Sequence, residues 1–351
     1  MVANQIKYVR EANLKVIGVG GAGCASLARL EELMPRSASL MGIDTGCATQ
    51  NLSSAIASIS FGTGFGSGGD PENARQQFVR VESLVREFIA GADVLIILAG
   101  LGRGTGSGVT PEIARLGREA GALTLAAVHM PFEFEGRFRN YSARLAANDL
   151  RLESDAVISI SNDDLSGVIR GGSSFHSAFN IADKTIVNAV NAIVAGFETD
   201  VTHATRVLDC LKQAGESVVL SAELTGKSAV ENVVSKAFES RKAKFAEVES
   251  ALLHVEGGIG LSRAQILEIV DQLRNRIGPW SNIHLTSKRL IGMGSDIEIT
   301  IVLAGVQEMG DPIAELETFV NTDTNPYIAQ SDLSPNQLST KQRVVELIPV
   351  S

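Results

Sequence analysis

The sequence predicts an α/β protein with a Rossmann-like parallel-sheet domain, a long central helix and a smaller α+β domain toward the C-terminus. Two apolar runs, at residues 14–20 and 93–99, are typical of fully buried strands, and each leads into a glycine turn and a helical pattern. From about residue 174 to 196, apolar residues recur at helical spacing and also lie off that stripe, which predicts a helix buried between two domains. Beyond Gly215, predicted strands alternate with predicted helices, and residues 297–301 alternate as a sheet with one exposed face does.

The composition narrows the classes of function. The 351 residues are 44% hydrophobic and 20% charged, enough for a large core and two domains, and the formal charge of −9 argues against a general nucleic-acid surface. The three cysteines are widely spaced and form no Cys-x-x-Cys, so neither a disulfide framework nor a zinc site is indicated. No apolar run is long enough to span a membrane, and the first residues lack a signal-peptide core. We therefore expect a cytoplasmic protein without a transmembrane segment or a nucleic-acid partner.

The clearest motif is the loop Leu98-Ala-Gly-Leu-Gly-Arg-Gly-Thr-Gly-Ser-Gly108, which lies between a predicted buried strand and a predicted helix. Its five glycines leave several backbone N–H groups free to turn toward one point, and a helix N-terminus adds a partial positive charge. The hydroxyls of Thr105 and Ser107 would add two donors. The Gly-Lys-Ser/Thr ending of a Walker A loop is missing, so the loop predicts a phosphate site of another class.

Two further glycine turns extend this prediction. Gly18, Gly20 and Gly23 satisfy Gly-x-Gly-x-x-Gly, and Asp44 follows a second predicted strand about twenty residues later, which by itself favours an NAD-dependent oxidoreductase. The loop at residues 62–70 precedes another helix start and supplies more closely spaced N–H groups. Three such turns suit a terminal triphosphate better than a bridged diphosphate, and the NAD interpretation stays as an alternative.

The order of these motifs resembles the FtsZ/tubulin superfamily, and its FtsZ branch in particular, over roughly residues 13–306. The resemblance rests on five motifs in sequence: Gly18-Val-Gly-Gly-Ala-Gly23, Gly66-Ser-Gly-Gly-Asp-Pro-Glu72, the loop at 100–108, Pro131-Phe-Glu-Phe-Glu-Gly-Arg137 and Ile160-Ser-Asn-Asp-Asp164. It implies a domain that binds GTP or GDP, a long central helix, and a smaller domain that completes the GTPase site of the next subunit. It also implies a head-to-tail homopolymer, a role in cell division, and Mg²⁺ held mainly by phosphates and water.

The resemblance also implies nucleotide-binding residues. Arg103 replaces a glycine of the family pattern and either adds a cation beside the phosphates or points to solvent. Ala25 stands where the family has an Asn, and the pair Asp183-Lys184 stands where it has Asn-Asp, so Asp183 would have to rotate to read guanine. The phosphate cradle comprises Gly20, Gly21, Ala22, Gly69, Gly102, Gly104, Thr105, Gly106 and Ser107, with Glu135 and Arg139 at the ribose and Asn162 and Phe179 at the base.

The catalytic loop of the family has a degenerate counterpart here. The family reads Asn-x-Asp-x-x-Asp, whose carboxylates orient the attacking water on a neighbouring subunit, and the nearest match places Glu198, Asp200 and His203 in a polar loop. Asp200 fits the pattern, His203 replaces the final acid, the preceding stretch is shorter, and Gly46 replaces an Asp of the partner-facing surface. The resemblance therefore implies slow or impaired hydrolysis and longer-lived filaments, or, alternatively, a non-polymerising regulatory paralogue.

The remaining histidines give no sign of a metal site. His129, His176, His254 and His284 lie on unrelated predicted elements without ligand spacing, so we expect structural histidines and no protein-bound metal cluster.

Domain boundaries follow from these segments. We expect a nucleotide-binding domain at residues 1–172, a central helix with a catalytic-type loop at 173–203, an α+β domain at 204–319 and a flexible tail at 320–351. The tail is rich in Asn, Thr, Asp, Ser, Pro and Gln, which is typical of poorly ordered chain. Its short apolar end, residues 344–350, is either a docking segment for a partner or a frayed terminus.

Overall fold

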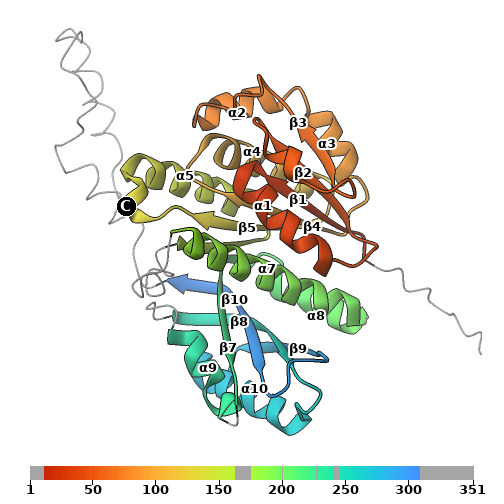
Figure 1. Cartoon of the computed structure of the whole chain (residues 1–351), viewed down its shortest axis with the longest axis vertical. Helices are drawn as coiled ribbons and strands as arrows, with labels where there is room; N and C mark the ends of the chain where they lie inside the picture. The colour runs from red at the N-terminus through yellow and green to blue at the C-terminus, as the bar shows by residue number, and fades with distance from the viewer. Residues whose placement is uncertain (1–11, 163–174, 200, 227, 240–244, 309–351) are drawn as a thin grey trace, which may run out of the picture. The chain divides into compact units, whose positions relative to one another are not determined.

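The structure is a computed structural model that describes residues 12–162, 175–199, 201–226, 228–239 and 245–308 (Figure 1). These residues fall in one compact unit that ends at Glu308. The predicted tail at 320–351 lies outside the described residues.

The described strands form one ten-stranded sheet, in the order β3-β2-β1-β4-β5-β6-β7-β10-β8-β9. The first six strands are parallel and have the order of a Rossmann sheet. The strands are β1 (Leu14–Val19), β2 (Ser39–Asp44), β3 (Ala57–Ser60), β4 (Val94–Gly100), β5 (Leu123–Met130), β6 (Ala156–Ser161), β7 (Gly215–Leu224), β8 (Phe245–Gly257), β9 (Asn282–Arg289) and β10 (Ile297–Glu308).

The two halves of the sheet are continuous, which differs from the separate α+β domain that the sequence predicts. Strand β6 pairs in parallel with β7 through Ala156, Val157 and Ile158. Beyond it, β10 is antiparallel to both β7 and β8, and β9 is parallel to β8. Because backbone pairing between β6 and β7 crosses from one half to the other, the sheet itself marks no domain boundary. The predicted boundaries at residues 172 and 203 therefore stay predictions.

The helices connect these strands and cover both faces of the parallel half (Figure 1). Local capping explains some of their ends: Asp70 accepts the Glu72 N–H ahead of Pro71, and Ser262 forms a capping box with Gln265. The helices are α1 (Gly20–Leu30), α2 (Pro71–Phe78), α3 (Glu82–Ile89), α4 (Gly104–Glu119), α5 (Arg137–Glu153), α7 (Phe175–Thr199), α8 (Val201–Leu211), α9 (Ala229–Glu239) and α10 (Arg263–Ile277).

Burial on both faces explains why the first strands read as continuous apolar runs. In β1, Val16 packs in one hydrophobic cluster with α1 and α7, whereas the next residue, Ile17, packs in another with α2 to α5. Successive strand side chains point to opposite faces, so a strand covered on both sides needs apolar residues at every position. A further cluster lies between the C-terminal strands and helices α9 and α10.

Helix α7 packs against both halves of the sheet. Its buried residues Ile186, Val190 and Ile193 belong to the cluster that contains Ile96 of β4, and the same cluster includes Val302 of β10. Apolar residues off the main stripe, such as Val187 and Val194, are buried as well. The burial predicted for this helix from its sequence is therefore confirmed.

The sequence predicts a polar loop at residues 198–203, and this prediction is wrong for most of the segment. Helix α7 continues to Thr199 and α8 begins at Val201, so Glu198 and His203 lie in helices and Asp200 lies outside the described residues. The segment contains no Gly or Pro to stop a helix, and Val207 and Leu211 bury the apolar face of α8 against the core. Tertiary packing thus extends both helices into a segment whose polarity suggested a loop.

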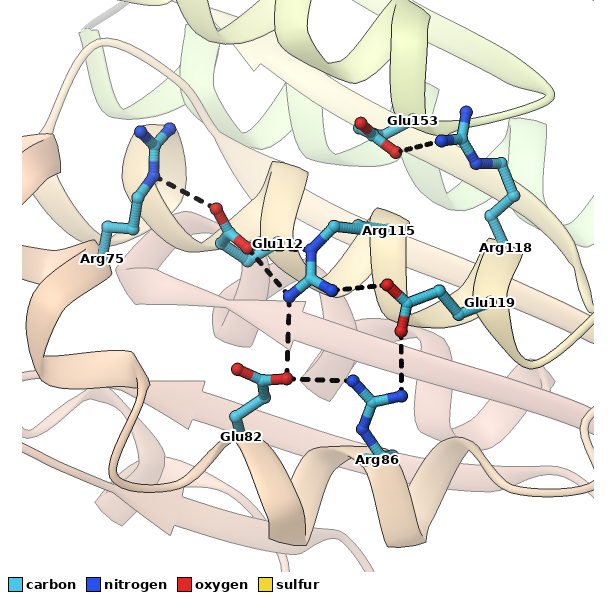
Figure 2. A network of polar contacts seen from close by, with 8 residues as sticks. All are labelled: Arg75, Glu82, Arg86, Glu112, Arg115, Arg118, Glu119 and Glu153. Atoms are coloured by element: carbon cyan, nitrogen blue, oxygen red, sulfur yellow. Dashed lines mark hydrogen bonds and ion pairs between the residues drawn. The ribbon is translucent and has the colours of Figure 1, made fainter.

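An ion-pair network fastens the helices that follow two of the glycine loops (Figure 2). Arg75 of α2 lies 3.3 Å from Glu112 of α4, and Arg115 bridges Glu112 at 3.1 Å and Glu119 at 2.6 Å. These side chains are partly exposed, so each pair contributes little by itself. The network is completed by Arg86 with Glu82 and Glu119, Arg115 with Glu82, and Arg118 with Glu153.

A buried polar network joins α7 to the C-terminal strands. Asn191 donates to Glu256 at 3.1 Å, and the His254 ring bonds both Glu256, at 3.1 Å, and the Thr286 hydroxyl, at 2.7 Å. His254 is 2% exposed, and both ring nitrogens have partners, as expected for a structural histidine. The His254 hydrogen bond lowers the pKa of Glu256 below 4.5, although burial acts in the opposite direction.

We predict that Glu256→Gln destabilises the protein by about 1–3 kcal/mol at pH 7, because a hydrogen-bonded buried charge is lost. The lowered pKa means that the contribution of Glu256 is fully present above pH 4.5 and is lost as the pH falls through the folded-state value. Denaturant unfolding from pH 7 to 3 should show a smaller acid-side loss in the variant than in the wild type. The exposed Glu268→Gln is the matched control, and equal pH profiles for wild type and Glu256→Gln would contradict the assignment.

Candidate functional site

A cavity of about 940 Å³ opens at the carboxyl ends of β1, β4 and β5. Strand β1 lies between β2 and β4, and this is where the strand order of the sheet reverses. In open α/β sheets, ligands bind in the crevice at such a switch point. The predicted nucleotide-binding residues that line the cavity are Gly20, Gly21, Ala22, Gly69, Gly102, Arg103, Gly104, Thr105, Gly106, Glu135, Arg139, Asn162 and Asp183.

The glycines of α4 are required by packing within the protein. A Cβ at Gly106 would lie 2.0 Å from the Gly100 carbonyl oxygen, and one at Gly104 would lie 1.7 Å from the Ser67 hydroxyl. Because neither glycine has a Cβ, the first turn of α4 can approach the end of β4 and the 62–70 loop. Gly21 differs, because it lines the cavity and a Cβ there would meet nothing within 4 Å.

The two hydroxyls of the glycine loop have different surroundings. Thr105 lines the cavity, and its hydroxyl lies 2.7 Å from that of Thr45. Ser107 is 3% exposed, is not part of the cavity wall, and accepts the Gly102 N–H at 2.7 Å. The structure therefore does not place Ser107 as an additional donor in the cavity, because its hydroxyl turns back to hold the loop.

The charged residues Arg103, Glu135 and Arg139 at the cavity wall come from three segments, since Glu135 lies between β5 and α5 and Arg139 lies in α5. Arg103 precedes α4, is exposed, and forms no ion pair with any described residue. Arg139 and Glu135 pair with each other, and Glu135 also accepts the Phe132 N–H at 3.0 Å. Phe65 and Phe138 also line the cavity and are 97% and 75% exposed, a feature that sequence reasoning missed.

The Asp183-Lys184 pair is oriented differently from the expectation. Asp183 already lines the cavity, so no rotation is required, whereas Lys184 lies 3.0 Å from Glu223 and 3.1 Å from Glu298 in the C-terminal half. Burial lowers the pKa of Lys184, but these two carboxylates outweigh it and the net shift is upward. Successive helix positions point about 100° apart, so only one member of the pair can face the cavity.

His129 was expected to be structural, and here the structure differs. It is 7% exposed, lines the cavity, and its Nε2 lies 3.2 Å from Asp183 Oδ1. Its position just before the end of β5, where strand ends meet ligands, was the available signal. Nearby, Asn162 is 4% exposed and its Oδ1 has no hydrogen-bond partner among the described residues. The Phe179 side chain lies outside the described residues.

Two of the predicted catalytic residues, Glu198 and His203, belong to helix positions far from this cavity. Asp183 lines the wall and α7 ends at Thr199, sixteen residues later, which is about 24 Å along the axis at about 1.5 Å per residue. Glu198 is near that far end and His203 is in the first turn of α8. Their side chains, like Asp200, lie outside the described residues.

Within the described ranges, no three His, Cys, Asp or Glu side chains gather closely enough to hold a metal ion. In the same ranges, no helix combines the length and the apolar character needed to cross a bilayer.

Comparison with known proteins relates the cavity to a family. Residues 13–170 match the Tubulin/FtsZ family, GTPase domain, a range that includes Gly18, Gly20, Gly23 and Asp44, which alone favoured NAD. The chain is 27% identical over 359 residues to the cell division protein FtsZ of Mycoplasmopsis pulmonis, covering 96% of this chain and 91% of that protein. It is 28% identical over 291 residues to cell division protein FtsZ 1 of Archaeoglobus fulgidus, covering 80% and 78%. The empty FtsZ dimer of M. jannaschii superposes with a TM-score of 0.78 at 25% identity, covering 84% of this chain and 89% of that one.

The glycine packing generates a prediction about stability. Gly106→Ala should destabilise the protein by about 1–3 kcal/mol, because the added methyl collides with the Gly100 carbonyl. Gly21→Ala should be neutral or stabilising by up to about 1 kcal/mol, because it removes a helical glycine and fills open space. Urea unfolding of both variants measures the difference, and equal midpoints would show that Gly106 is not tightly packed.

Proposed function

We propose that this chain, whose residues 13–170 match the Tubulin/FtsZ family, GTPase domain, binds GTP in the cavity and assembles head to tail into filaments in which hydrolysis is slow. The observation that carries the proposal is the convergence of three glycine-rich turns on one cavity at the switch point of a parallel sheet. The proposal also assigns the predicted roles to the residues that line it.

The cavity suits a nucleoside triphosphate at both ends. Backbone N–H groups for the phosphates would come from the N-termini of α1 and α4 and from the 65–69 turn. The Arg103 side chain would approach the same phosphates. Asn162 and Asp183, which also line the cavity, would meet the base, and Glu135 and Arg139 would meet the ribose. Mg²⁺ would be held by phosphate oxygens and water, which is its usual preference in phosphate sites. Stacking of Phe179 on the base remains part of the proposal.

Hydrolysis within one isolated subunit is incompatible with the length of α7. Because its far end lies about 24 Å from Asp183, Glu198, Asp200 and His203 could act only on nucleotide held by another copy. His203 in place of an acid, and a single residue between α7 and α8, weaken the positioning of an attacking water. Turnover should therefore be slow and should depend on contact between subunits.

Exposed aromatic side chains near the two opposite ends of the strands support a head-to-tail contact. Phe65 and Phe138 lie at the cavity, near the carboxyl ends of the parallel strands. Trp280 lies two residues before β9, which runs in the same direction as β6, so it lies near the amino ends of the strands, and it is 93% exposed. Large exposed aromatic residues are typical of interfaces. Two different patches at opposite ends of the strands would give a heterologous contact that repeats from one subunit to the next.

A non-polymerising regulatory protein is the second candidate. The observation that favours it is the near absence of a loop between α7 and α8, where the family places the segment that reaches the next subunit. Such a protein would bind GTP without assembling.

Gly21→Val tests nucleotide binding without altering the packing of the fold. The branched side chain would project into the cavity, so GTP affinity should fall by at least about tenfold. Titration with a fluorescent GTP analogue measures the loss, and the melting temperature reports folding. Gly260→Val is the matched control, since a Cβ there also meets nothing within 4 Å but lies outside the cavity wall. Unchanged affinity in Gly21→Val would place the nucleotide elsewhere.

Light scattering tests assembly across a concentration series with GTP, with GDP and without nucleotide. We expect a rise with GTP above a threshold concentration, and a threshold raised severalfold by Trp280→Gln but not by Leu84→Gln, an exposed residue on the lateral helix α3. Phosphate release per subunit should be slow and should increase with concentration. A flat trace at every concentration, with GTP binding measured separately, would favour the regulatory alternative.

A further inference from the structure

Four polar side chains meet at the base end of the cavity. Ser26 and Arg29 come from α1, His129 from β5, and Asp183 from α7. Ser26 and His129 are 0% and 7% exposed, whereas the Arg29 side chain is 43% exposed. A buried carboxylate is costly unless other groups hold it, so the partners of Asp183 determine how it can serve the cavity.

Both carboxylate oxygens of Asp183 have donors on the protein side. Oδ1 accepts the Ser26 hydroxyl at 3.1 Å and lies 3.2 Å from His129 Nε2, and Oδ2 lies 3.4 Å from Arg29 Nη2. Arg29 Nη2 is itself oriented by Asn180 at 2.7 Å. Three donors from two elements restrict the rotation of the carboxylate. Oδ1 already has two donors, whereas Oδ2 keeps lone-pair capacity for a donor that enters the cavity.

The two nitrogens of the His129 ring differ in their surroundings. Nε2 faces Asp183 and lies 3.4 Å from the Ser26 hydroxyl, whereas Nδ1 is buried and has no partner among the described residues. A neutral ring with its proton on Nε2 donates to Asp183 and leaves only a lone pair buried at Nδ1. The opposite tautomer would bury an unpaired N–H and turn a lone pair toward a carboxylate. The partners therefore assign the proton to Nε2.

We propose that His129 is a positioning residue: its Nε2–H holds Asp183 as an oriented acceptor and thereby sets the preference of the cavity for guanine over other bases. This inference rests on the proposed function above. Guanine offers two adjacent donors, N1–H and the exocyclic amine, to one carboxylate, whereas adenine presents an acceptor at N1. A site built to accept these donors rejects adenine, because adenine would turn its N1 lone pair toward the Asp183 carboxylate.

Two substitutions separate hydrogen bonding from packing. In His129→Gln the side-chain amide nitrogen stands three bonds from Cβ, as His Nε2 does, so the donor to Asp183 is retained. In His129→Asn the amide nitrogen stands two bonds from Cβ, as Nδ1 does, so the donor to Asp183 is lost. Both variants shrink a buried ring to an amide, which makes each the control for the other.

The full-length protein is titrated with GTP, with inosine triphosphate, which lacks the exocyclic amine, and with ATP. We expect His129→Gln to keep the wild-type ratio of affinities within about threefold, and His129→Asn to reduce the GTP-to-ATP ratio by about tenfold to a hundredfold, the range for a lost hydrogen bond to a charged group. The affinity for inosine triphosphate should fall less in His129→Asn than the affinity for GTP, because inosine triphosphate lacks the exocyclic amine. Inorganic tripolyphosphate, which has no base, should bind all three proteins equally. Ser26→Ala removes a second donor to the same oxygen and should also lower the ratio.

Other outcomes would overturn the inference. Equal affinity ratios in wild type, His129→Gln and His129→Asn would show that His129 does not position the base-reading group, while GTP binding by the wild type would leave the proposed function intact. Equal loss in both variants, with tripolyphosphate binding unchanged, would assign His129 to packing alone. A wild type that binds GTP and ATP equally would remove Asp183 as the base reader. A wild type that binds neither nucleotide would refute the proposed function and this inference with it.

Discussion

The burial of α7 against both halves of the sheet is the constraint on which the rest of the structure depends. It contacts β5 and β6 of the parallel half and β7, β8 and β10 of the other half, so its axis cannot shift without opening the core. Asp183, in the first half of α7, lies at the cavity, and Glu198 lies near the far end of the same helix. The distance between the two is therefore a property of the core and not of a flexible loop.

Close backbone packing shapes the part of the cavity proposed to hold the phosphates. Gly106 sits against the Gly100 carbonyl and Gly104 sits against Ser67, so the glycine loop, β4 and the 62–70 turn form one packed unit. The ion pairs from Arg75 and Arg115 extend this unit to α2 and α3. Backbone N–H groups held in this way need little reorganisation when an anion binds, which is the advantage of a preorganised site.

The base end of the cavity is organised by side chains instead. Asp183, Ser26, Arg29 and His129 belong to three elements that are distant in sequence, and their contacts form only when α1, β5 and α7 pack together. In the proposed site, hydrogen bonding to the base would therefore depend on tertiary packing more strongly than phosphate binding would. This difference explains why a polyphosphate and a purine base are useful as separate probes of the same cavity.

The sequence by itself determined the parallel α/β class, the glycine turns and the burial of α7, because period, glycine spacing and apolar runs are local properties. It also named thirteen of the residues that line the cavity, since strand ends and glycine turns meet where the parallel strands end. Only the tertiary structure decided that Ser107 turns away, that Asp183 and not Lys184 faces the cavity, and that His129 contacts Asp183. It likewise decided that residues 198–203 are mostly helical and that both halves share one sheet. These outcomes depend on which side chains meet across distant elements, and that information is absent from any local pattern.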